Sequence, residues 1–409
     1  MKSTKYLLIG GGLASCEAAK GIRKHDTEGS ITMVGMEAHI PYNRPPLSKA
    51  FLQGDKTKAE CFCEKAGFYE ENGVEMLLGH RVTELDAKQK KATLDNREEI
   101  GFEKALLATG GDPVRLPING IGLGNVFMLR TLDDSMAIQA AARRGGNAVV
   151  IGAGFIGMEV TASLARMGLQ VTVIENNDRL WPRFADPQLA EKLREYYQAK
   201  GVNVMTSEKV AEIRGPGNAQ HVLTESGQEI SCDFVVCAVG IKPNLELAEQ
   251  AKLDIDNGVV VNSNLQTSAP DIFAAGDIAN FPDPYFNKRR RVEHWGQAEY
   301  SGGLAGENMA GANEDYDLLT YVWSEGFDLH YEFAGEEGVY DKVVMRGEFP
   351  ENNCAALYLC ENKLRGFIAV NPDDEVLGAL EGLVNNQTDL TGKEEALAHP
   401  GSNLAELTA

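Results

Sequence analysis

The sequence predicts an α/β protein with two dinucleotide-binding domains of the Rossmann type and a small C-terminal α/β domain. The main observation is a glycine-rich motif that occurs twice, each time between an apolar run typical of a buried strand and a helical pattern. A second observation is a set of short apolar strands that end in glycine. The length of 409 residues allows two to three domains, which fits this arrangement.

Composition and charge limit the partners. The net charge is −21, from 39 basic and 60 acidic residues, which disfavours nucleic acid and anionic lipid. No apolar run approaches about 18 residues, so we expect no membrane-spanning helix, and the N-terminal residues lack the pattern of a secretory signal. The seven cysteines have no framework spacing, which is typical of the reducing cytoplasm.

The first glycine-rich motif lies in residues 6–15, YLLIGGGLAS. Gly10 allows a tight turn after the strand, and Gly12 lets the backbone approach a pyrophosphate at the N-terminus of the following helix. Ser15 occupies the third small position, where Gly is more typical, so an ordinary strand-to-helix turn is an alternative for this motif alone. Glu37, which follows the next apolar run, corresponds to the ribose-binding acid of such sites.

The second motif, AVVIGAGFIG in residues 148–157, contains the complete GxGxxG pattern at Gly152, Gly154 and Gly157. Glu175 stands at the end of the next apolar run. A carboxylate in this place accepts hydrogen bonds from the adenosine ribose hydroxyls and repels a 2′-phosphate. This half of the chain is therefore predicted to prefer NAD to NADP.

Three short apolar strands end in glycine, in residues 105–111, 235–240 and 267–277 (ALLATGG, VVCAVG and TSAPDIFAAGD). Glycine lets the backbone reach a ligand, and Asp277 is placed to accept a hydrogen bond from a ribitol hydroxyl. Any one of these ends alone is compatible with an ordinary strand-to-turn transition. Together with the two motifs they predict FAD and NAD(H) as cofactors.

Residues 41–49, PYNRPPLSK, combine three prolines with Arg44 and Lys49. Proline fixes φ and removes a backbone donor, so this segment cannot continue the preceding strand. From the residues alone, the simplest interpretation is a proline-stiffened turn into a helix, with Lys49 facing solvent.

These motifs, together with GAGFIGME, RRRVEHW and YVWSEGFDL, resemble those of the two-dinucleotide flavoprotein reductases. Within this superfamily of pyridine nucleotide-disulphide oxidoreductases, the sequence is most similar to the NADH-dependent ferredoxin and rubredoxin reductases of oxygenase systems, which lack the redox disulphide. Apoptosis-inducing factor is a close relative. The resemblance covers residues 5–370. It implies an FAD-binding domain (1–112 and 243–317), an NAD-binding domain (113–242) and a C-terminal α/β domain (318–409).

The resemblance also implies roles for single residues. Arg44 would lie toward the FAD pyrophosphate. Lys49 would lie close to flavin N5 and pair with Glu159, and these two are the expected catalytic residues. Trp295 would form an aromatic wall beside the isoalloxazine, although a buried Trp is more often part of a core.

The implied cofactor contacts come from both halves of the chain. They are Gly10, Gly12, Ala14, Ser15, Glu37, Arg44, Lys49, Val82, Thr109, Gly110, Arg130, Gly152, Gly154, Ile156, Gly157, Glu159, Glu175, Arg183, Gly240, Gly276, Asp277, Glu293, His294 and Trp295. Among these, Arg183 and its neighbour Arg179 resemble the family's basic contacts to the NAD phosphates. A solvated helix start is the alternative for both arginines.

No cysteine lies in residues 41–49, where related reductases carry a redox disulphide. Cys232 and Cys237 are too far apart along one expected strand to bridge. The CxC of Cys61 and Cys63 has the means to bind a metal or oxidise, but buried or surface thiols are the simpler interpretation. Electrons would therefore leave the flavin directly, to a one-electron iron–sulfur protein such as ferredoxin or rubredoxin.

Two other functions are compatible with the same motifs. One is an NADH oxidase or quinone reductase without a protein partner, and the other is a redox-responsive protein like apoptosis-inducing factor. A monomer or a homodimer is expected.

The C-terminal part alternates like two antiparallel strands, at residues 355–359 and 364–370, with a turn at 361–362. Residues 385–409 are polar, are punctuated by Gly and Pro and match the family poorly, so we expect a surface tail. The cationic run 288–291 is a candidate docking patch for an acidic ferredoxin. Alternatively, these cations pair with the chain's own acids or contact FAD.

Overall fold

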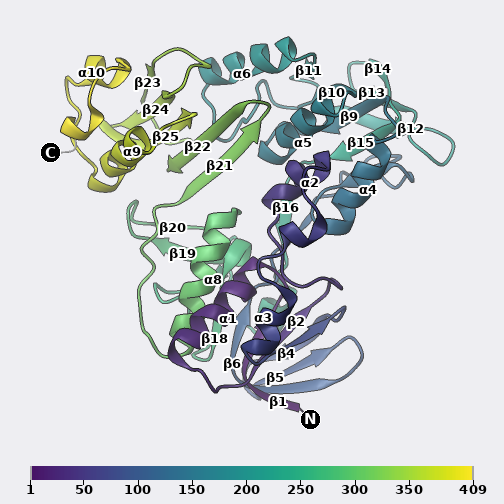
Figure 1. Ribbon diagram of the computed structural model, residues 1–409, viewed down its shortest axis with the longest axis vertical. Helices are drawn as coiled ribbons and strands as arrows, with labels where there is room; N and C mark the ends of the chain where they lie inside the picture. The colour runs from purple at the N-terminus through teal and green to yellow at the C-terminus, as the bar shows by residue number, and fades with distance from the viewer. Residues whose placement is uncertain (1, 408–409) are drawn as a thin grey trace. The chain divides into compact units, whose positions relative to one another are not determined.

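The computed structural model describes residues 2–407, and the chain divides into two compact units (Figure 1). The first unit consists of Met1–Asn43, Lys58–Asp112 and Lys242–Thr320. The second consists of Arg44–Thr57, Pro113–Ile241 and Tyr321–Ala409. The chain changes unit after residues 43, 57, 112, 241 and 320. The third and fourth of these passages lie in β7 (Gly111–Pro113) and β16 (Ile241–Pro243), which pair with each other. The proline-rich segment with Lys49 thus belongs to the second unit.

A seven-stranded sheet forms the centre of the first unit, in the order β3–β2–β1–β6–β5–β4, with β18 paired to β6. Strands β3, β2, β1, β6 and β18 are parallel neighbours, and β5 runs antiparallel to β4 and β6. The apolar run 6–9 lies in the central strand β1 and is buried, as a parallel strand covered on both faces requires. The bounds are β1 Lys2–Ile9, β2 Ile31–Gly35, β3 Val74–Leu78, β4 Val82–Asp86, β5 Lys91–Leu94, β6 Glu99–Leu107 and β18 Ile272–Ala274.

Two helices of the first unit, α1 (Leu13–His25) and α8 (Trp295–Met309), pack with their backbones in contact. A Cβ atom at Gly302 would lie 2.4 Å from the carbonyl oxygen of Ala14, so a larger side chain would separate the helices. The remaining helical segments are η2 (Lys58–Cys61), α3 (Ala66–Glu71), α7 (Glu246–Gln250) and η3 (Gly276–Ile278). A small sheet contains β17 (Val259–Val260), β19 (Ala279–Asp283) and β20 (Lys288–Arg290).

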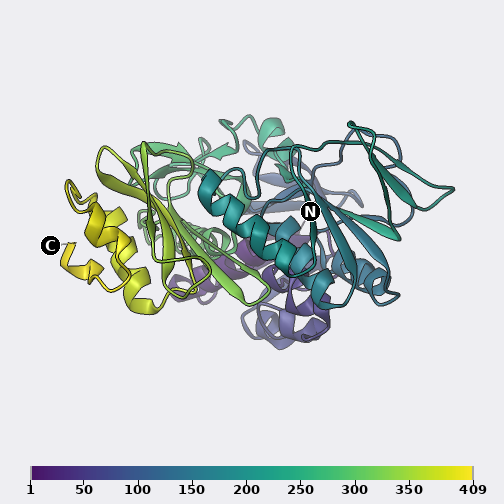
Figure 2. The ribbon, with the colours of Figure 1, turned by 90° about the horizontal axis from the view of Figure 1, so that it is seen from above.

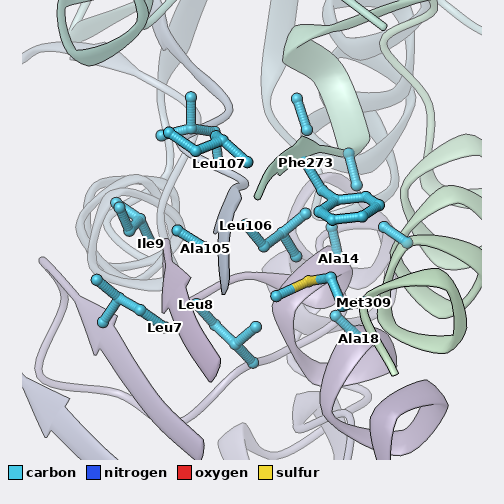
Figure 3. Close-up of a cluster of buried hydrophobic side chains, with 14 of the residues drawn as sticks. Leu7, Leu8, Ile9, Ala14, Ala18, Ala105, Leu106, Leu107, Phe273 and Met309 are labelled. Carbon is cyan, nitrogen blue, oxygen red and sulfur yellow. The ribbon is translucent and has the colours of Figure 1, made fainter. Parts of the chain in front are cut away.

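The core of the first unit lies between its central strands and these two helices (Figure 3). Leu8 of β1, Leu106 of β6 and Phe273 of β18 point toward Ala14 of α1 and Met309 of α8, and all are buried. The carboxyl ends of three parallel strands thereby converge on the start of α1, which positions the first glycine-rich motif.

The second unit contains a five-stranded parallel sheet in the order β11–β10–β9–β15–β8. Its strands are β8 Val126–Met128, β9 Asn147–Ile151, β10 Gln170–Ile174, β11 Asn203–Met205 and β15 Phe234–Cys237. Three antiparallel strands follow β11 in the chain, namely β12 Val210–Arg214, β13 His221–Thr224 and β14 Glu229–Ser231. The helical segments are η1 Pro45–Ser48, α2 Ala50–Gln53, α4 Leu132–Ala142, α5 Phe155–Arg166 and α6 Pro187–Ala199.

The second unit also contains an antiparallel sheet in the order β21–β22–β25–β24–β23. Its strands are β21 Tyr321–Gly326, β22 Leu329–Gly335, β23 Lys342–Arg346, β24 Cys354–Cys360 and β25 Lys363–Val370. Helices α9 (Asp374–Asn386) and α10 (Glu394–Ala398), yellow in Figure 2, lie on one side of this sheet. The predicted strand pair around the turn at 361–362 and the predicted α/β class are confirmed.

An aromatic cluster joins the C-terminal antiparallel sheet to α5 and to the loop that follows β10. The ring centroids of Trp181 and Tyr331 are 4.7 Å apart, and those of Phe184 and Phe333 are 5.1 Å apart. Phe155, at the start of α5, packs on Trp181 at 4.8 Å. Such aromatic pairs contribute beyond their buried area. The C-terminal sheet is thereby fixed against the sheet that carries the second glycine-rich motif.

The expected surface tail at residues 385–409 is wrong for its described part. Leu390, Leu397 and Leu404 are buried, with exposed fractions of 1%, 0% and 3%. Arg346 of β23 is buried as well, and its guanidinium donates to the carbonyl oxygens of Leu397, His399, Pro400 and Ser402. The three leucines pack this otherwise polar segment into the core, and the guanidinium of Arg346 provides hydrogen bonds for its backbone carbonyl groups.

Candidate active site

The first glycine-rich turn leaves the N-terminus of α1 open. Gly10 has φ +128°, and a Cβ atom there would lie 2.1 Å from the carbonyl oxygen of Ala108, so only glycine fits. Gly12 is the N-cap of α1, has no side-chain cap, and has nothing within 4 Å of the position of a Cβ atom. The buried Oγ of Ser15 has no hydrogen-bond partner among the described residues. Open space, free N–H groups and an unsatisfied hydroxyl fit the pyrophosphate of a dinucleotide.

The acidic residue of this half lies beyond β2. Oε2 of Glu37 accepts a hydrogen bond from Tyr42 Oη at 2.5 Å. Tyr42 is buried and was not predicted from the sequence, although it stands in the proline-rich motif. Val82 begins β4 with its side chain in the core, so a contact from this residue to a cofactor would come from its backbone.

The strand that ends in Ala-Gly-Asp meets the start of α1. Gly276 has φ +72°, and its N–H donates to Oγ of Ser301 at 2.9 Å. A Cβ atom at Gly276 would lie 3.3 Å from Cβ of Ala14, so the backbone before Asp277 lies next to the first turn of α1. This brings two predicted contact segments of the first unit together.

Other predicted contacts of the first unit have partners of their own. Oγ1 of Thr109, which precedes Gly110, donates to the carbonyl oxygen of Asn244 at 2.8 Å. Nε1 of Trp295 donates to Oδ1 of Asn43 at 2.8 Å, which fixes the indole at the start of α8. His294 is the N-cap of that helix, and its imidazole accepts from the N–H of Gly296.

The second glycine-rich turn repeats this geometry in the second unit. A Cβ atom at Gly152 would lie 2.5 Å from the carbonyl oxygen of Ala238, and one at Gly157 would lie 2.0 Å from that of Gly152. Gly154 is the N-cap of α5, again without a side-chain cap and with nothing within 4 Å of the position of a Cβ atom. Ile156, in the first turn, is 46% exposed. A second dinucleotide fits here for the same reason. Gly240, with φ +104°, lies in the turn between β15 and β16.

Glu175 holds this turn from the end of β10. Its Oε2 accepts the N–H of Ala153 at 2.7 Å, and its Oε1 accepts the backbone N–H and the side-chain amide of Asn177 at 2.9 and 2.6 Å. A carboxylate offers about four lone-pair positions. The remaining acceptor capacity fits a ribose hydroxyl.

The two arginines after Glu175 differ in their surroundings. Nε of Arg179 lies 3.0 Å from Oδ1 of Asp178. Arg183 is exposed, and its guanidinium lies 3.6 Å from Glu337 and over the ring of Phe184. Both side chains have acidic neighbours in the second unit.

Lys49 and Glu159 form a buried ion pair in the second unit. Nζ of Lys49 lies 3.0 Å from Oε1 of Glu159, which is the pairing predicted from the sequence, and their side chains are 11% and 4% exposed. The interpretation of Lys49 as a solvent-facing residue is therefore wrong. The 3-10 turn η1, which begins at Pro45, ends at Ser48 and places Lys49 at the start of α2, inside the unit.

Three residues complete the environment of this pair and were not predicted. Oγ of Ser324 donates to Oε1 of Glu159 at 2.8 Å, and Oγ of Ser48 donates to Oε2. Nζ of Lys49 lies 4.6 Å from the ring centroid of Trp323, a cation–π distance. Trp323 and Ser324 belong to the YVWSEGFDL motif. The resemblance of this motif to the family marks the segment as functional, whereas the pairing of charged residues gives no reason to select either residue.

A cavity of about 160 Å³ opens beside this pair and is lined by Lys49, Glu159, Arg166 and Glu325 among others. The imidazole of His330 lies 3.8 Å from Glu325 and 2.8 Å from Glu332, and these carboxylates raise its pKa to about 9. The surroundings of the pair are therefore charged and accessible to water, while the pair itself is buried.

Arg44 and Arg130 meet, because the guanidinium of Arg44 donates to the carbonyl oxygen of Arg130. The N–H of Arg130 in turn donates to Oδ2 of Asp134 at 3.0 Å, within the capping box that starts α4. These contacts fix Arg44 and Arg130, both predicted cofactor contacts, in one place of the second unit.

The cationic run 288–291 is largely satisfied inside the first unit. Arg290 is 6% exposed and pairs with Asp283 at 3.0 Å. Arg291 pairs with Glu293 at 2.6 Å and donates to the carbonyl oxygen of Asp277 at 2.9 Å. The prediction of one continuous docking patch is therefore wrong for these two arginines, because local acids and carbonyls satisfy them.

Residues 2–407 show neither a metal-ligand cluster nor a membrane-spanning helix. No group of three or more His, Cys, Asp or Glu residues there could hold a metal ion. Within the same residues, no helix is long and apolar enough to cross a bilayer. All seven cysteines are free.

Comparisons with known proteins agree with this geometry. Residues 4–302 match the family described as pyridine nucleotide-disulphide oxidoreductase, and residues 321–408 match the reductase C-terminal family. The second match contradicts our expectation that the end of the chain fits the family poorly.

Similar proteins span nearly the whole chain. Rhodocoxin reductase of Rhodococcus erythropolis is 32% identical over 391 residues, covering 95% of this chain and 91% of the relative. Rubredoxin-NAD(+) reductase of Pseudomonas putida is 31% identical over 340 residues, covering 83% and 88%. A solved covalent complex of putidaredoxin reductase with putidaredoxin matches with a TM-score of 0.93 at 27% identity, covering 100% and 98%. The chain therefore belongs to the pyridine nucleotide-disulphide oxidoreductase family, whose cofactors are FAD and NAD(H).

Proposed function

We propose that this protein is an NADH-dependent reductase that passes electrons from NADH through FAD to a small one-electron iron–sulfur protein, a ferredoxin or a rubredoxin. The observation that carries the proposal is the buried pair of Lys49 and Glu159, whose lysine stands in the proline-rich segment where related enzymes carry a cysteine pair. With no dithiol there, electrons have to leave the flavin directly. The names of the relatives, a rubredoxin reductase and a complex with putidaredoxin, support this type of acceptor.

We assign FAD to the domain of residues 1–112 and 243–317, NAD(H) to residues 113–242, and partner contacts to residues 318–409. The open N-termini at Gly12 and Gly154 would each hold a pyrophosphate through backbone N–H groups. Glu175 would accept a ribose hydroxyl and exclude NADPH by repulsion. Bound FAD would accept a hydride and release its electrons one at a time.

The roles of the chain's own residues follow from their contacts. Ser48 and Ser324 hold the Glu159 carboxylate, which holds the Lys49 ammonium at a fixed position. A fixed cation would stabilise the negative charge that develops as hydride arrives, without reorganisation at that moment. We further propose that the protein works in the cytoplasm, where thiols stay reduced.

The test is NADH consumption by the purified holoprotein with a panel of ferredoxins and rubredoxins, and separately with dioxygen and with quinones. We expect rapid turnover with at least one iron–sulfur protein and slow turnover with the small oxidants. Faster turnover with dioxygen or quinones than with every iron–sulfur protein would contradict the proposal and would favour an NADH oxidase or quinone reductase.

A further inference from the structure

The segment Arg44–Thr57 carries Lys49 and belongs to the second unit, although the residues before and after it belong to the first. It contains η1 and α2, and Lys49 is the residue that joins them. Both helices have only four residues, too few to be stable by themselves. Contacts from the rest of the second unit therefore hold the segment, and α2 lies beside α4 and α5 (Figure 1).

Helix α4 holds the segment through two polar side chains. Oγ of Ser135, which is fully buried, donates to the carbonyl oxygen of Leu47 at 2.7 Å. One helical turn later, Nε2 of Gln139 donates to the carbonyl oxygen of Phe51 at 2.7 Å. Residues four apart share a face of a helix, so a single face of α4 provides both donors. Leu52 adds an apolar contact, because it is buried in the core of the second unit.

Helix α5 holds the same segment and also provides the countercharge of Lys49. Oγ of Ser163, which is 1% exposed, donates to the carbonyl oxygen of Ser48 at 2.7 Å and accepts from Nε2 of Gln53 at 2.8 Å. Ser163 lies one turn after Glu159, so their side chains share a face of α5. Ser163 thus fixes the backbone just before Lys49, and Glu159 fixes the ammonium at the other end of the side chain.

We propose that Ser135 and Ser163 are positioning residues of the reductase, which set the position of the Lys49 ammonium by fixing the backbone that carries it. Lysine has a flexible four-carbon stem, so a fixed backbone and a fixed countercharge are both needed to hold Nζ in one place. The effect of the two serines on catalysis rests on the proposed function, in which Lys49 acts in flavin reduction.

The test compares Ser135→Ala and Ser163→Ala with the wild-type holoprotein. Stopped-flow reduction of the bound flavin by NADH is measured for each change alone and in the Lys49→Met background. Each change alone should slow reduction by about fivefold, the effect of one lost hydrogen bond, with little change in the Kd for NADH. In the Lys49→Met background neither change should slow reduction further, because the residue through which the serines act is gone.

Hydrogen exchange of the same holoproteins, followed by mass spectrometry, tests the attachment of the segment itself. Backbone amides of residues 47–53 should exchange several-fold faster in both variants, while those of the five-stranded parallel sheet should be unchanged. Thr161→Val is the matched control. Thr161 is fully buried two positions before Ser163, and among the described residues its hydroxyl has no hydrogen-bond partner. This variant should match the wild type in both reduction and exchange.

Wild-type exchange at residues 47–53 in both variants would overturn the inference. Equal slowing by Ser163→Ala in the wild type and in the Lys49→Met background would overturn it too, because the serine would then act without Lys49. If Lys49→Met itself reduced the flavin at the wild-type rate, the proposed function of Lys49 would be wrong. The exchange measurement would still decide whether the two serines hold the segment, so the two failures can be distinguished.

Discussion

Replacing Lys49 by methionine tests the buried ion pair directly. Methionine keeps much of the length and apolar stem of lysine but removes the ammonium that lies 3.0 Å from Oε1 of Glu159. The Glu159 carboxylate would remain 4% exposed, with Ser48 and Ser324 as its donors and no facing cation. Removing one partner of a buried pair costs about 3–5 kcal/mol, because the other charge stays buried.

A double variant separates this cost from lost packing. In Lys49→Met/Glu159→Gln, a neutral amide replaces the carboxylate and needs no countercharge. Its oxygen accepts from one serine hydroxyl, and its NH2 group donates to the oxygen of the other, whose hydroxyl turns away. The free energy of unfolding of the double variant should fall within about 1–2 kcal/mol of the wild type, because replacing both partners of a buried pair is often nearly neutral. The single variant should therefore be less stable than the double variant.

The assay is chemical unfolding of the wild type, both single variants and the double variant, together with stopped-flow reduction of the bound flavin by NADH. We expect non-additive stabilities and, for Lys49→Met, flavin reduction at least about tenfold slower, equivalent to about 1.4 kcal/mol. Additive stabilities would refute the ion pair as a stabilising interaction. Wild-type reduction rates in Lys49→Met would refute its proposed role in hydride transfer.

Three further changes probe other parts of the molecule. Glu175→Ser should narrow the preference for NADH over NADPH by about 1–3 kcal/mol in steady-state kinetics, whereas a wild type that uses both equally would contradict the assignment. Arg346→Met should expose the C-terminal segment to limited proteolysis and cost on the order of 3 kcal/mol, while Lys342→Ala on the same strand removes only an exposed ion pair and should cost less than about 1 kcal/mol. The stabilising effect of His330, with its pKa raised to about 9, should be complete below about pH 6.5 and be lost as pH rises through about 9. Melting temperatures of the wild type and His330→Gln should therefore converge by about pH 10, and a constant difference would refute this.

The glycine-rich turns could be predicted because their constraints are local. Gly10 and Gly152 each combine a positive φ with a carbonyl oxygen that would lie 2.1 and 2.5 Å from a Cβ atom, which leaves no other residue type. The strand before each turn and the helix after it follow from apolar periodicity over a few residues. The ion pair of Lys49 and Glu159 was predictable only through the family motifs, because its partners come from distant parts of the chain. Ser48, which also donates to Glu159, is 111 positions away from it.

The C-terminal segment and the hydroxyl donors could not be predicted, because their partners are distant in the chain and chemically ordinary. Arg346 satisfies four carbonyl oxygens more than fifty positions away, and the segment from residue 397 to 402 gives no pattern that calls for a buried cation. Ser48 and Ser324 contribute one hydroxyl each, and a single serine has no periodicity that reveals its partner.

The role of the cationic run 288–291 could not be predicted from the sequence either, because the sequence does not show which charges are paired inside the protein. A row of four cations suggests attraction of an acidic protein, but steering depends on the charge that the surface presents after internal pairing. Arg290 is buried against Asp283, and Arg291 pairs with Glu293, so these two add little net positive field. Lys288 and Arg289 are the exposed members, and their field is screened over roughly 8–10 Å at ordinary salt. On a chain of net charge −21, an acidic acceptor would therefore need apolar or hydrogen-bonding contacts to dock. Because salt screens the repulsion between two acidic proteins, the apparent KM for such an acceptor should stay level or fall as salt rises.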